Sequence, residues 1–462
     1  MSLSEHPINL VLAATLAAGL WLPPAPDTAA AESGLRLQDA EQIAPNLNQA
    51  DNQAAAHDPS KFLTIAEAVA TALRDNPGLA EIQARADAMA EIPSQAGTLP
   101  DPRVSFSAMS LPVDSFSTTS EDMTQMQFGL NQMIPFPGKL GLQELAAKYE
   151  AAAESKNVGE MRLLLARDVK TLWWTLFNLD QSLHIVTHNQ ELLRQFVAIA
   201  QTKYRVGQGL QQDVLLAQLE LSKLLDMELS LKGARRGEEA RLNVLLNQSP
   251  DQALALPQEV DKDLPGLANE PALYALAERS RPLLAGQQDL IQAANTRVEL
   301  ARKDYYPDFD LGFAYGLRNG YEPGRSPRSD MASFMLSMNV PIFVGRKQSK
   351  AVAQRKSELI EQNYKLHDLR NMIKAEISMA AADYRRARSQ FELFGTGIIP
   401  QAQQTVSSML AGYQVNEVDY LNLINAQVTL YNYETNYWRM LSEARQALAR
   451  IAAAVGEENI YE

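Results

Sequence analysis

The chain has 462 residues, no cysteine and a formal net charge of −13, with 42 basic against 55 acidic side chains. The absence of cysteine excludes a disulfide framework and a thiolate metal site, and the acidic balance argues against nucleic acid as a partner. The few histidines are scattered and no glycine-rich phosphate loop is present, so nothing is assembled for nucleophilic or phosphoryl chemistry. We therefore expect a protein that is not an enzyme and needs no cofactor.

Residues 1–31 have the character of a secretory signal peptide. An apolar run from Leu10 to Leu22 is followed by prolines, and Ala29–Ala31 offers small residues for cleavage. The segment before the run lacks Lys and Arg and carries Glu5, which departs from the usual signal pattern. Residues 32–62 are rich in Ala, Gln, Asn and Asp and are predicted to form a flexible lead-in. Beyond the signal, no uncharged apolar run reaches the roughly 18 residues of a membrane-spanning helix.

The first helix is predicted to begin near Thr64, because Glu67 follows it at the spacing of a capping box. Pro77 marks a break or a kink, and the helical pattern then continues to about Ala96. A later segment repeats this pattern, and its landmarks are Pro271, Pro282 and Lys303.

Four segments alternate between apolar and small or polar residues, which is the period of a β-strand. They cover residues 103–108, 125–131, 309–317 and 332–340. Segments of about ten residues with one apolar face suit a transmembrane barrel with a wet lumen, whereas a pair of soluble hairpins is the alternative. Because four strands are too few to close around a lumen, a barrel requires two, three or four chains to combine.

Long helices follow each pair of strands. Apolar residues recur in alternating steps of four and three from Leu165 to Tyr204 and again from Ile373 to Ile398, which predicts coiled-coil packing. An unbroken helix over residues 139–204 would span on the order of 100 Å. The predicted return helices and the proline-containing linker between the two copies cover residues 210–246, 418–455 and 249–270.

Two tyrosines mark the turns of the helical hairpins. Tyr204 and Tyr413 are 209 residues apart, and several residues near them, including Val206 and Val415, match at the same offset without a gap. Each ends a long helical pattern and is followed by a short polar turn and a second helical pattern. Gly207 and Gly209 are expected to supply the left-handed conformations that the first turn needs. The chain is therefore a duplicated unit in which each copy ends in a helical tip.

The duplicated order of helix, strand, loop, strand, long helix, tyrosine turn and helix resembles the TolC-like outer membrane efflux protein family over roughly residues 62–456. The resemblance implies a mixed α and β fold, in which a homotrimer forms one β-barrel from four strands per chain. A long α-helical coiled-coil barrel would continue this β-barrel. The implied domains are a first repeat, a linker, a second repeat and a short tail, at residues 63–248, 249–270, 271–456 and 457–462.

The resemblance also implies a function and partners. The homotrimer would be the exit duct of a tripartite efflux system in the Gram-negative outer membrane. Its β-barrel would be embedded in outer-membrane lipid, and its helices would form a long periplasmic extension. A periplasmic adaptor protein and an inner-membrane resistance-nodulation-division pump would supply heavy-metal ions or small toxic compounds. The segment Gln132–Lys139 further resembles the branch that serves heavy-metal pumps. The alternatives are a periplasmic coiled-coil scaffold and a passive porin, although a porin has short periplasmic turns.

The helical tips are the expected gate of the pore. Family members commonly carry acidic residues just after the second turn, where this chain has Asn422 and Asn425, so we predict a polar but uncharged constriction. Glu417 and Asp419 are nearby acids. The full set of expected tip and gating residues is Tyr204, Gly207, Gly209, Asp213, Tyr413, Glu417, Asp419, Asn422 and Asn425.

A weaker candidate site lies inside the first long helix. His184 and His188 are four residues apart on one helical face, and Glu191 follows three residues later, a spacing suited to a transition metal. His184 adjoins the core position Leu183, and the sequence gives no third ligand from another helix. We therefore expect packing residues here and assign no metal.

Overall fold

The computed structural model describes residues 62–462 except 323, 325, 416, 458, 459, 461 and 462. The predicted signal peptide and the predicted lead-in up to residue 61 lie outside the described residues. The first repeat contains α2 (Ile65–Asp75), α3 (Pro77–Ala90), α4 (Ile92–Gly97), β1 (Arg103–Met109), β2 (Gln125–Ile134), α5 (Lys139–Arg205) and α6 (Gln211–Leu245). The second repeat contains α7 (Glu270–Ser280), α8 (Pro282–Lys303), β3 (Phe309–Leu317), β4 (Met331–Met338), α9 (Gln348–Leu393), the π-helix η1 (Phe394–Ile398), α10 (Ile399–Gln414) and α11 (Tyr420–Val455).

The local signals in the sequence produce the predicted helix ends. Thr64 and Glu67 form the reciprocal capping box at the start of α2. Asn76 then caps α3 by accepting a hydrogen bond from the backbone N–H of Leu79, and Pro77 occupies the first turn, where a missing N–H costs nothing. The same break separates α7 from α8 at Pro282. The expected interruption at Pro77 is confirmed.

The strands form one antiparallel sheet in the order β1-β2-β3-β4, so the two repeats join through β2 and β3. The register places the predicted apolar positions of all four strands on one face and small or polar residues on the other. Rows across the apolar face are Val104–Leu130–Phe313–Phe334 and Phe106–Phe128–Tyr315–Ala332, and a row across the other face is Ser105–Gly129–Ala314–Ser333. These apolar side chains are not covered by the rest of the described chain, since Val104 is 80% and Phe334 84% exposed. This is the reverse of a soluble sheet that packs a core.

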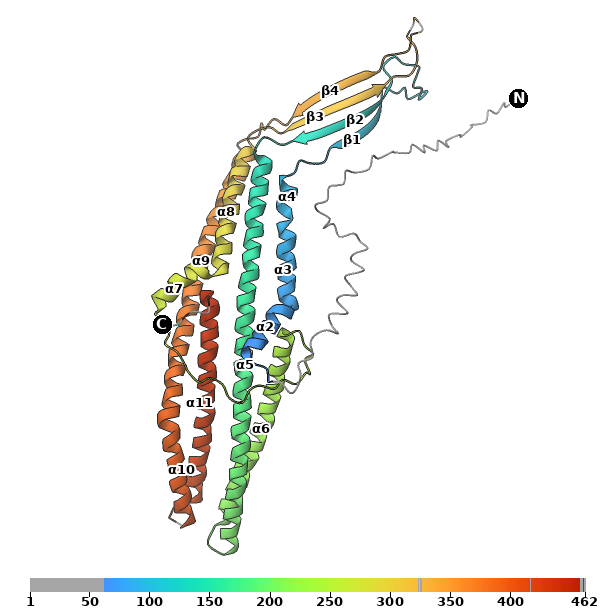
Figure 1. The fold of residues 1–462 in the computed structure, drawn as a ribbon. Helices are drawn as coiled ribbons and strands as arrows, with labels where there is room; N and C mark the ends of the chain where they lie inside the picture. Colours follow the sequence, from blue (N-terminus) through green and yellow to red (C-terminus); the bar gives the residue numbers. More distant parts are fainter. Residues whose placement is uncertain (1–61, 323, 325, 416, 458–459, 461–462) are drawn as a thin grey trace, which may run out of the picture. The chain divides into compact units, whose positions relative to one another are not determined.

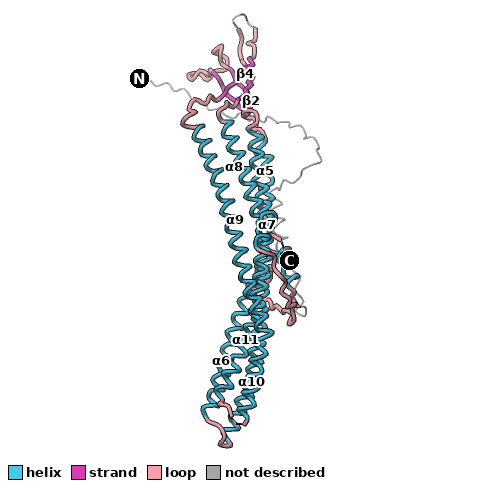
Figure 2. Tube along the Cα trace, turned by 90° about the vertical axis from the view of Figure 1, so that its left-hand side faces the viewer, coloured by secondary structure: helices cyan, strands magenta, loops and turns pink. Residues whose placement is uncertain are grey.

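The helices run alongside one another from the sheet to the two hairpin turns (Figures 1 and 2). The longest, α5, has 67 residues and packs along α6, α8 and α11. No helix among the described residues contains a stretch long and apolar enough to cross a membrane.

The helix α5 buries more of its surface than the single predicted stripe. The predicted positions Leu165, Val169 and Leu176 are buried, and so is a second stripe that the heptad pattern did not include. This second stripe contains Trp173, Phe177, Ile185, Asn189 and Phe196. It is buried because α5 lies between two neighbours, α6 on one side and α11 on the other, so that a two-helix pattern underestimates its contacts.

The second long helix differs from the first because it is interrupted by η1. Pro400 lies at the start of α10 and has no backbone N–H to donate to the preceding turn. The wider turn of η1 directly before it accommodates this missing hydrogen bond. The predicted continuous heptad from Ile373 to Ile398 therefore ends in a local change of helical period.

The segment predicted as a linker contains no helix before α7, but it is packed against the helices. Leu254 and Leu264 are buried in the main core. Tyr384 of α9 donates its hydroxyl to the Pro265 carbonyl at 2.5 Å, and Arg445 of α11 donates to the Asp263 carbonyl at 2.7 Å. These contacts fix the segment against the helices of the second repeat.

A buried ion pair joins the two repeats where α7 meets α8. Arg281 contacts Glu160 of α5 through two guanidinium nitrogens, at 2.6 and 2.9 Å, and also donates to the Ala453 carbonyl of α11. The side chains of Arg281 and Glu160 are 4% and 7% exposed. Paired in this way, two charges are tolerated inside the protein, and the guanidinium fixes the spacing of three helices.

We predict that Glu160→Gln lowers the stability of the helical region by about 3–5 kcal/mol, because it leaves the Arg281 charge buried without a counter-ion. Thermal melting of the helical circular dichroism signal in detergent measures the change. Glu238→Gln is the matched control, because the Glu238–Arg241 pair is on the surface and contributes at most about 1 kcal/mol. Equal melting temperatures for the two variants would contradict the assignment.

Candidate pore tip

The turns of both hairpins lie at the same end of the helices (Figure 1). A lysine side chain joins them. Lys203, in the last turn of α5, donates to the backbone carbonyl of Tyr413 at the end of α10. Its ammonium also lies over the Tyr413 ring, 4.2 Å from the centroid. A charged hydrogen bond and a cation–π contact therefore link the first repeat to the second, and the sequence analysis did not identify Lys203.

The two tip tyrosines, which match in sequence, have different surroundings. Tyr413 is 5% exposed and packs against the ring of Tyr420 with centroids 5.0 Å apart, whereas Tyr204 is 49% exposed. Among the described residues, neither the Tyr413 nor the Tyr420 hydroxyl has a hydrogen-bond partner. Burial raises the pKa of both phenols, so both remain neutral. Tyr420 was also missed, because the first repeat has Gln211 in the corresponding position.

The two glycines of the first turn act differently. Gly207 has φ +77°, the left-handed conformation that was expected. The same expectation for Gly209 is wrong, because its φ is not in the left-handed range. Gly209 is instead needed for space: a Cβ there would lie 2.9 Å from the Lys203 Cβ and 3.1 Å from the Tyr204 backbone nitrogen. The backbone of the turn therefore packs directly against Lys203, the residue that joins the hairpins.

Asp213 lies in the first turn of α6, close to the charges of Lys203 and Asp419. Burial raises the pKa of its carboxyl, and the nearby Asp419 carboxylate raises it further, while a backbone hydrogen bond and Lys203 lower it. Asp419 is the N-cap residue of α11, so the two acids begin the return helices of the two hairpins. The tip therefore brings one lysine and two aspartates together from both repeats.

The remaining predicted residues face solvent. Glu417 closes the second turn by donating its backbone N–H to the Gly412 carbonyl at 2.9 Å. Its side chain is exposed, as are those of Asn422 and Asn425 on α11. In contrast, Leu423 and Ile424 between them are buried against α5. This alternation directs the two asparagines away from the contact between the hairpins.

Comparison with known proteins identifies the family. The profile of the family described as outer membrane efflux protein matches residues 68–248 and 273–457, one match for each repeat. The chain belongs to the outer membrane efflux protein family. It is an outer-membrane channel with a long helical extension in the periplasm, and the members of this family act in efflux together with adaptor and pump partners.

Curated and solved relatives agree with this assignment. The cobalt-zinc-cadmium resistance protein CzcC of Cupriavidus metallidurans is 22% identical over 400 residues, which cover 85% of this chain and 90% of CzcC. The outer membrane protein VceC of Vibrio cholerae has a TM-score of 0.71 at 18% identity, covering 85% of this chain and 96% of VceC. CusC has a TM-score of 0.72 at 16% identity, covering 85% and 92%. These likenesses support the TolC-like fold.

The histidine pair of this efflux protein borders a small cavity. His184 and His188 line a space of 240 Å³ together with Glu434 and Trp438 of α11. Burial raises the pKa of Glu434, whereas a hydrogen bond from Gln403 and the nearby His188 lower it. Glu191 does not line the cavity, and no three His, Asp or Glu side chains of the described residues are placed to hold a metal ion.

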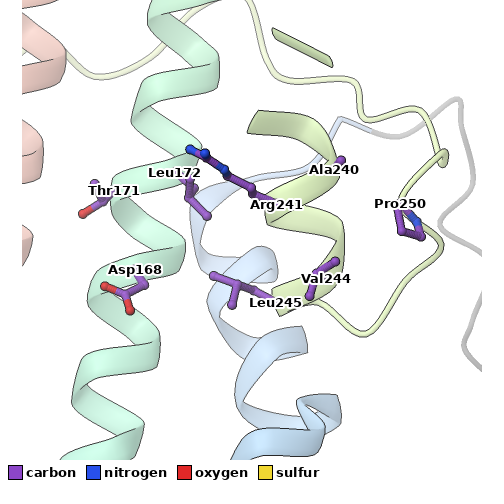
Figure 3. Close-up of a pocket in the computed structure, with 8 residues that line it drawn as sticks. All are labelled: Asp168, Thr171, Leu172, Ala240, Arg241, Val244, Leu245 and Pro250. Carbon is purple, nitrogen blue, oxygen red and sulfur yellow. The ribbon is translucent and has the colours of Figure 1, made fainter. Parts of the chain in front are cut away.

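A larger apolar cavity of 640 Å³ lies between α5 and α6, at the end of α6 remote from the tip (Figure 3). Its apolar lining residues are Leu172, Ala240, Val244, Leu245 and Pro250. Asp168 and Thr171 of α5 also border the space, and Arg241 extends from α6 toward Leu172 (Figure 3). The exposed wall of the cavity is nevertheless almost entirely apolar.

We predict that the contact between the two hairpins weakens as the pH rises through the acid range. A raised pKa means that packed hairpins bind the Asp213 proton more tightly than separated hairpins do, so the contribution of this proton to the contact is present at low pH and is lost above the raised pKa. Asp213→Asn keeps the neutral form and should flatten the dependence of single-channel conductance on pH. Asp226→Asn, at an exposed position of α6, is the control. An unchanged pH profile in Asp213→Asn would exclude this carboxyl.

Proposed function

We propose that this chain is the outer-membrane exit duct of a tripartite efflux system for heavy-metal cations, and that its resting tunnel is closed at the helical tips. The main support for this proposal is the contact of Lys203 with Tyr413, which links the two hairpins of one chain. A periplasmic adaptor that docks at this end would open the duct by separating the hairpins. The inner-membrane pump would then deliver its substrate into the tunnel.

The proposed duct is a homotrimer. The described sheet has two edge strands, β1 and β4, and unpaired edge backbone is not tolerated in lipid. Pairing β4 of one chain with β1 of the next around a threefold axis gives a closed barrel of 12 strands. Native mass spectrometry in detergent should detect three chains, and a stable monomer with intact strand signal would exclude this assembly.

The proposed substrate class is supported by CzcC, whose name associates it with cobalt, zinc and cadmium. Deletion of the chain should lower the tolerated concentrations of these cations, and expression of the intact protein should restore them. Organic toxic compounds provide the contrasting arm of the assay. Sensitivity confined to organic compounds would leave the duct intact as a proposal but would exclude heavy metals as its cargo.

The contact between Lys203 and Tyr413 predicts the effect of removing the lysine charge. Lys203→Met loses a charged hydrogen bond worth about 1.5–3 kcal/mol, so the open fraction should rise by a factor of roughly 10 to 150. Single-channel recording in planar bilayers measures this fraction. Lys223→Met, which removes a surface pair with Glu220 on α6, should leave it unchanged. Equal open fractions for Lys203→Met and the wild type would place the gate elsewhere.

The asparagines predict the charge of the constriction. Asn422→Asp combined with Asn425→Asp would place six carboxylates around the threefold axis of the proposed trimer, so divalent cations should block the double variant more strongly than the wild type. Conductance with and without a divalent cation tests this effect. If the block is the same in both proteins, these side chains do not face the constriction.

A further inference from the structure

The two connections from strand to long helix differ between the repeats. In the first repeat, residues 135–138 join β2 to α5, and the connection is held firmly. Lys139 contacts Asp304 and Asp308 at 3.0 Å each, and the Phe136 ring stacks on Tyr306 with centroids 4.5 Å apart. In the second repeat, residues 339–347 join β4 to α9 and lack a comparable set of contacts among the described residues. This longer connection, together with the start of α9, forms the segment 339–350.

The segment 339–350 exposes four large apolar side chains. Val340 is 67%, Ile342 73%, Phe343 67% and Val344 39% exposed. Val340 follows Met338 on the even-numbered row of β4 that carries the apolar face of the sheet, and Asn339 still bonds to Asp308 as an extension of the ladder. Exposed apolar side chains therefore continue along the chain past the end of the strand.

A group of cations follows directly. Arg346, Lys347 and Lys350 are exposed, and residues 339–350 contain no acidic side chain, although the whole chain has a net charge of −13. None of the three forms an ion pair with a described residue. The backbone N–H of Lys347 donates to the Phe343 carbonyl at 2.9 Å, a single helical turn that sets the cations next to the apolar group.

We propose that the segment 339–350 is an anchor in the periplasm-facing leaflet of the outer membrane, which binds anionic phospholipid headgroups. Ile342 and Phe343 enter the boundary of the acyl chains, and Arg346, Lys347 and Lys350 contact the headgroup phosphates. Exposed apolar residues beside unpaired cations are the composition that an anionic membrane surface attracts. The proposal rests on the membrane location of the sheet.

A second copy of the chain fits this surface less well than lipid does. The buried centres of protein interfaces are depleted in charged residues, and three unpaired cations would have to be desolvated there. The apolar row of the segment also continues the outward face of β4, which is the face turned to lipid in a barrel. Tyr306, 51% exposed beside Phe136, adds an aromatic side chain at the same end of the sheet.

The location is testable because the natural chain has no cysteine, so single labels are unambiguous. Phe343→Cys is labelled with bimane in the full-length protein, in nanodiscs of phosphatidylcholine and phosphatidylglycerol with brominated acyl chains. Phe334→Cys on β4 is the lipid-facing control. Tyr364→Cys is the water-facing control, because it lies about 24 Å along α9 from its start.

We expect quenching at Phe343→Cys to approach that at Phe334→Cys and to exceed that at Tyr364→Cys. Quenching equal to that of Tyr364→Cys would overturn the anchor. The anchor would also be overturned if a neighbouring chain covered the label and shielded it from the brominated lipid. A loss of quenching at Phe334→Cys as well would instead refute the membrane location of the sheet, so the two failures are distinguishable.

The headgroup contact has its own test. The triple variant Arg346→Gln, Lys347→Gln, Lys350→Gln should retain phosphatidylglycerol more weakly in native mass spectrometry, by roughly fivefold for each charge removed. Retention of phosphatidylcholine should not change. Arg355→Gln, Lys356→Gln, Lys365→Gln removes the same charge further along α9 and is the matched control. Wild-type retention of phosphatidylglycerol by the first triple variant would exclude headgroup binding.

Discussion

The structure depends on one constraint: a four-stranded sheet with an apolar outer face and two edges cannot remain alone in lipid. Buried backbone groups need partners, and in a bilayer no water supplies them. The register of β1 to β4 satisfies every interior strand and leaves the requirement only at β1 and β4. In the proposed trimer the apolar rows across the sheet face lipid, and the small residues opposite them face inward. The helices are attached to the ends of these strands, so closure of the sheet also sets the arrangement of the helices.

The contact between the two hairpins includes buried polar pairs. Gln427 donates to Asn189 at 2.7 Å, and Ser442 donates to the Trp174 carbonyl at 2.7 Å. Both pairs are buried between α5 and α11, where a lost partner would leave a desolvated polar group. Such pairs fix the register of two long helices more strictly than apolar contacts, which tolerate sliding. The register must be fixed here because a small rotation near the sheet becomes a large displacement at the tips.

The sequence predicts the features that repeat with a regular period or carry a local signal. The alternation of 309–317, the capping box at Thr64 and the heptads of α5 each determine their element without help from distant residues. In contrast, η1 arises from a conflict between Pro400 and a helix that tertiary packing holds in place, which the apolar period does not reveal. The second buried stripe of α5 was missed for a related reason, because it depends on how many helices surround α5. Lys203 was missed because its partner is a backbone carbonyl, which leaves no mark in the sequence.

The duplication also explains why the two tips are unequal. Tyr204 and Tyr413 match in sequence, but only Tyr413 is covered, because Lys203 and Tyr420 have no counterparts that would cover Tyr204. Lys203 belongs to the first repeat and bonds to the backbone of the second, so the contact is made once per chain and not twice. The buried phenols of Tyr413 and Tyr420 lack partners among the described residues, a cost that the apolar packing around the rings has to offset. Separation of the hairpins would give both phenols water, so the apolar packing and the lysine contact that join the hairpins are opposed by two unsatisfied hydroxyls. A contact with this balance suits a gate that a partner protein has to open.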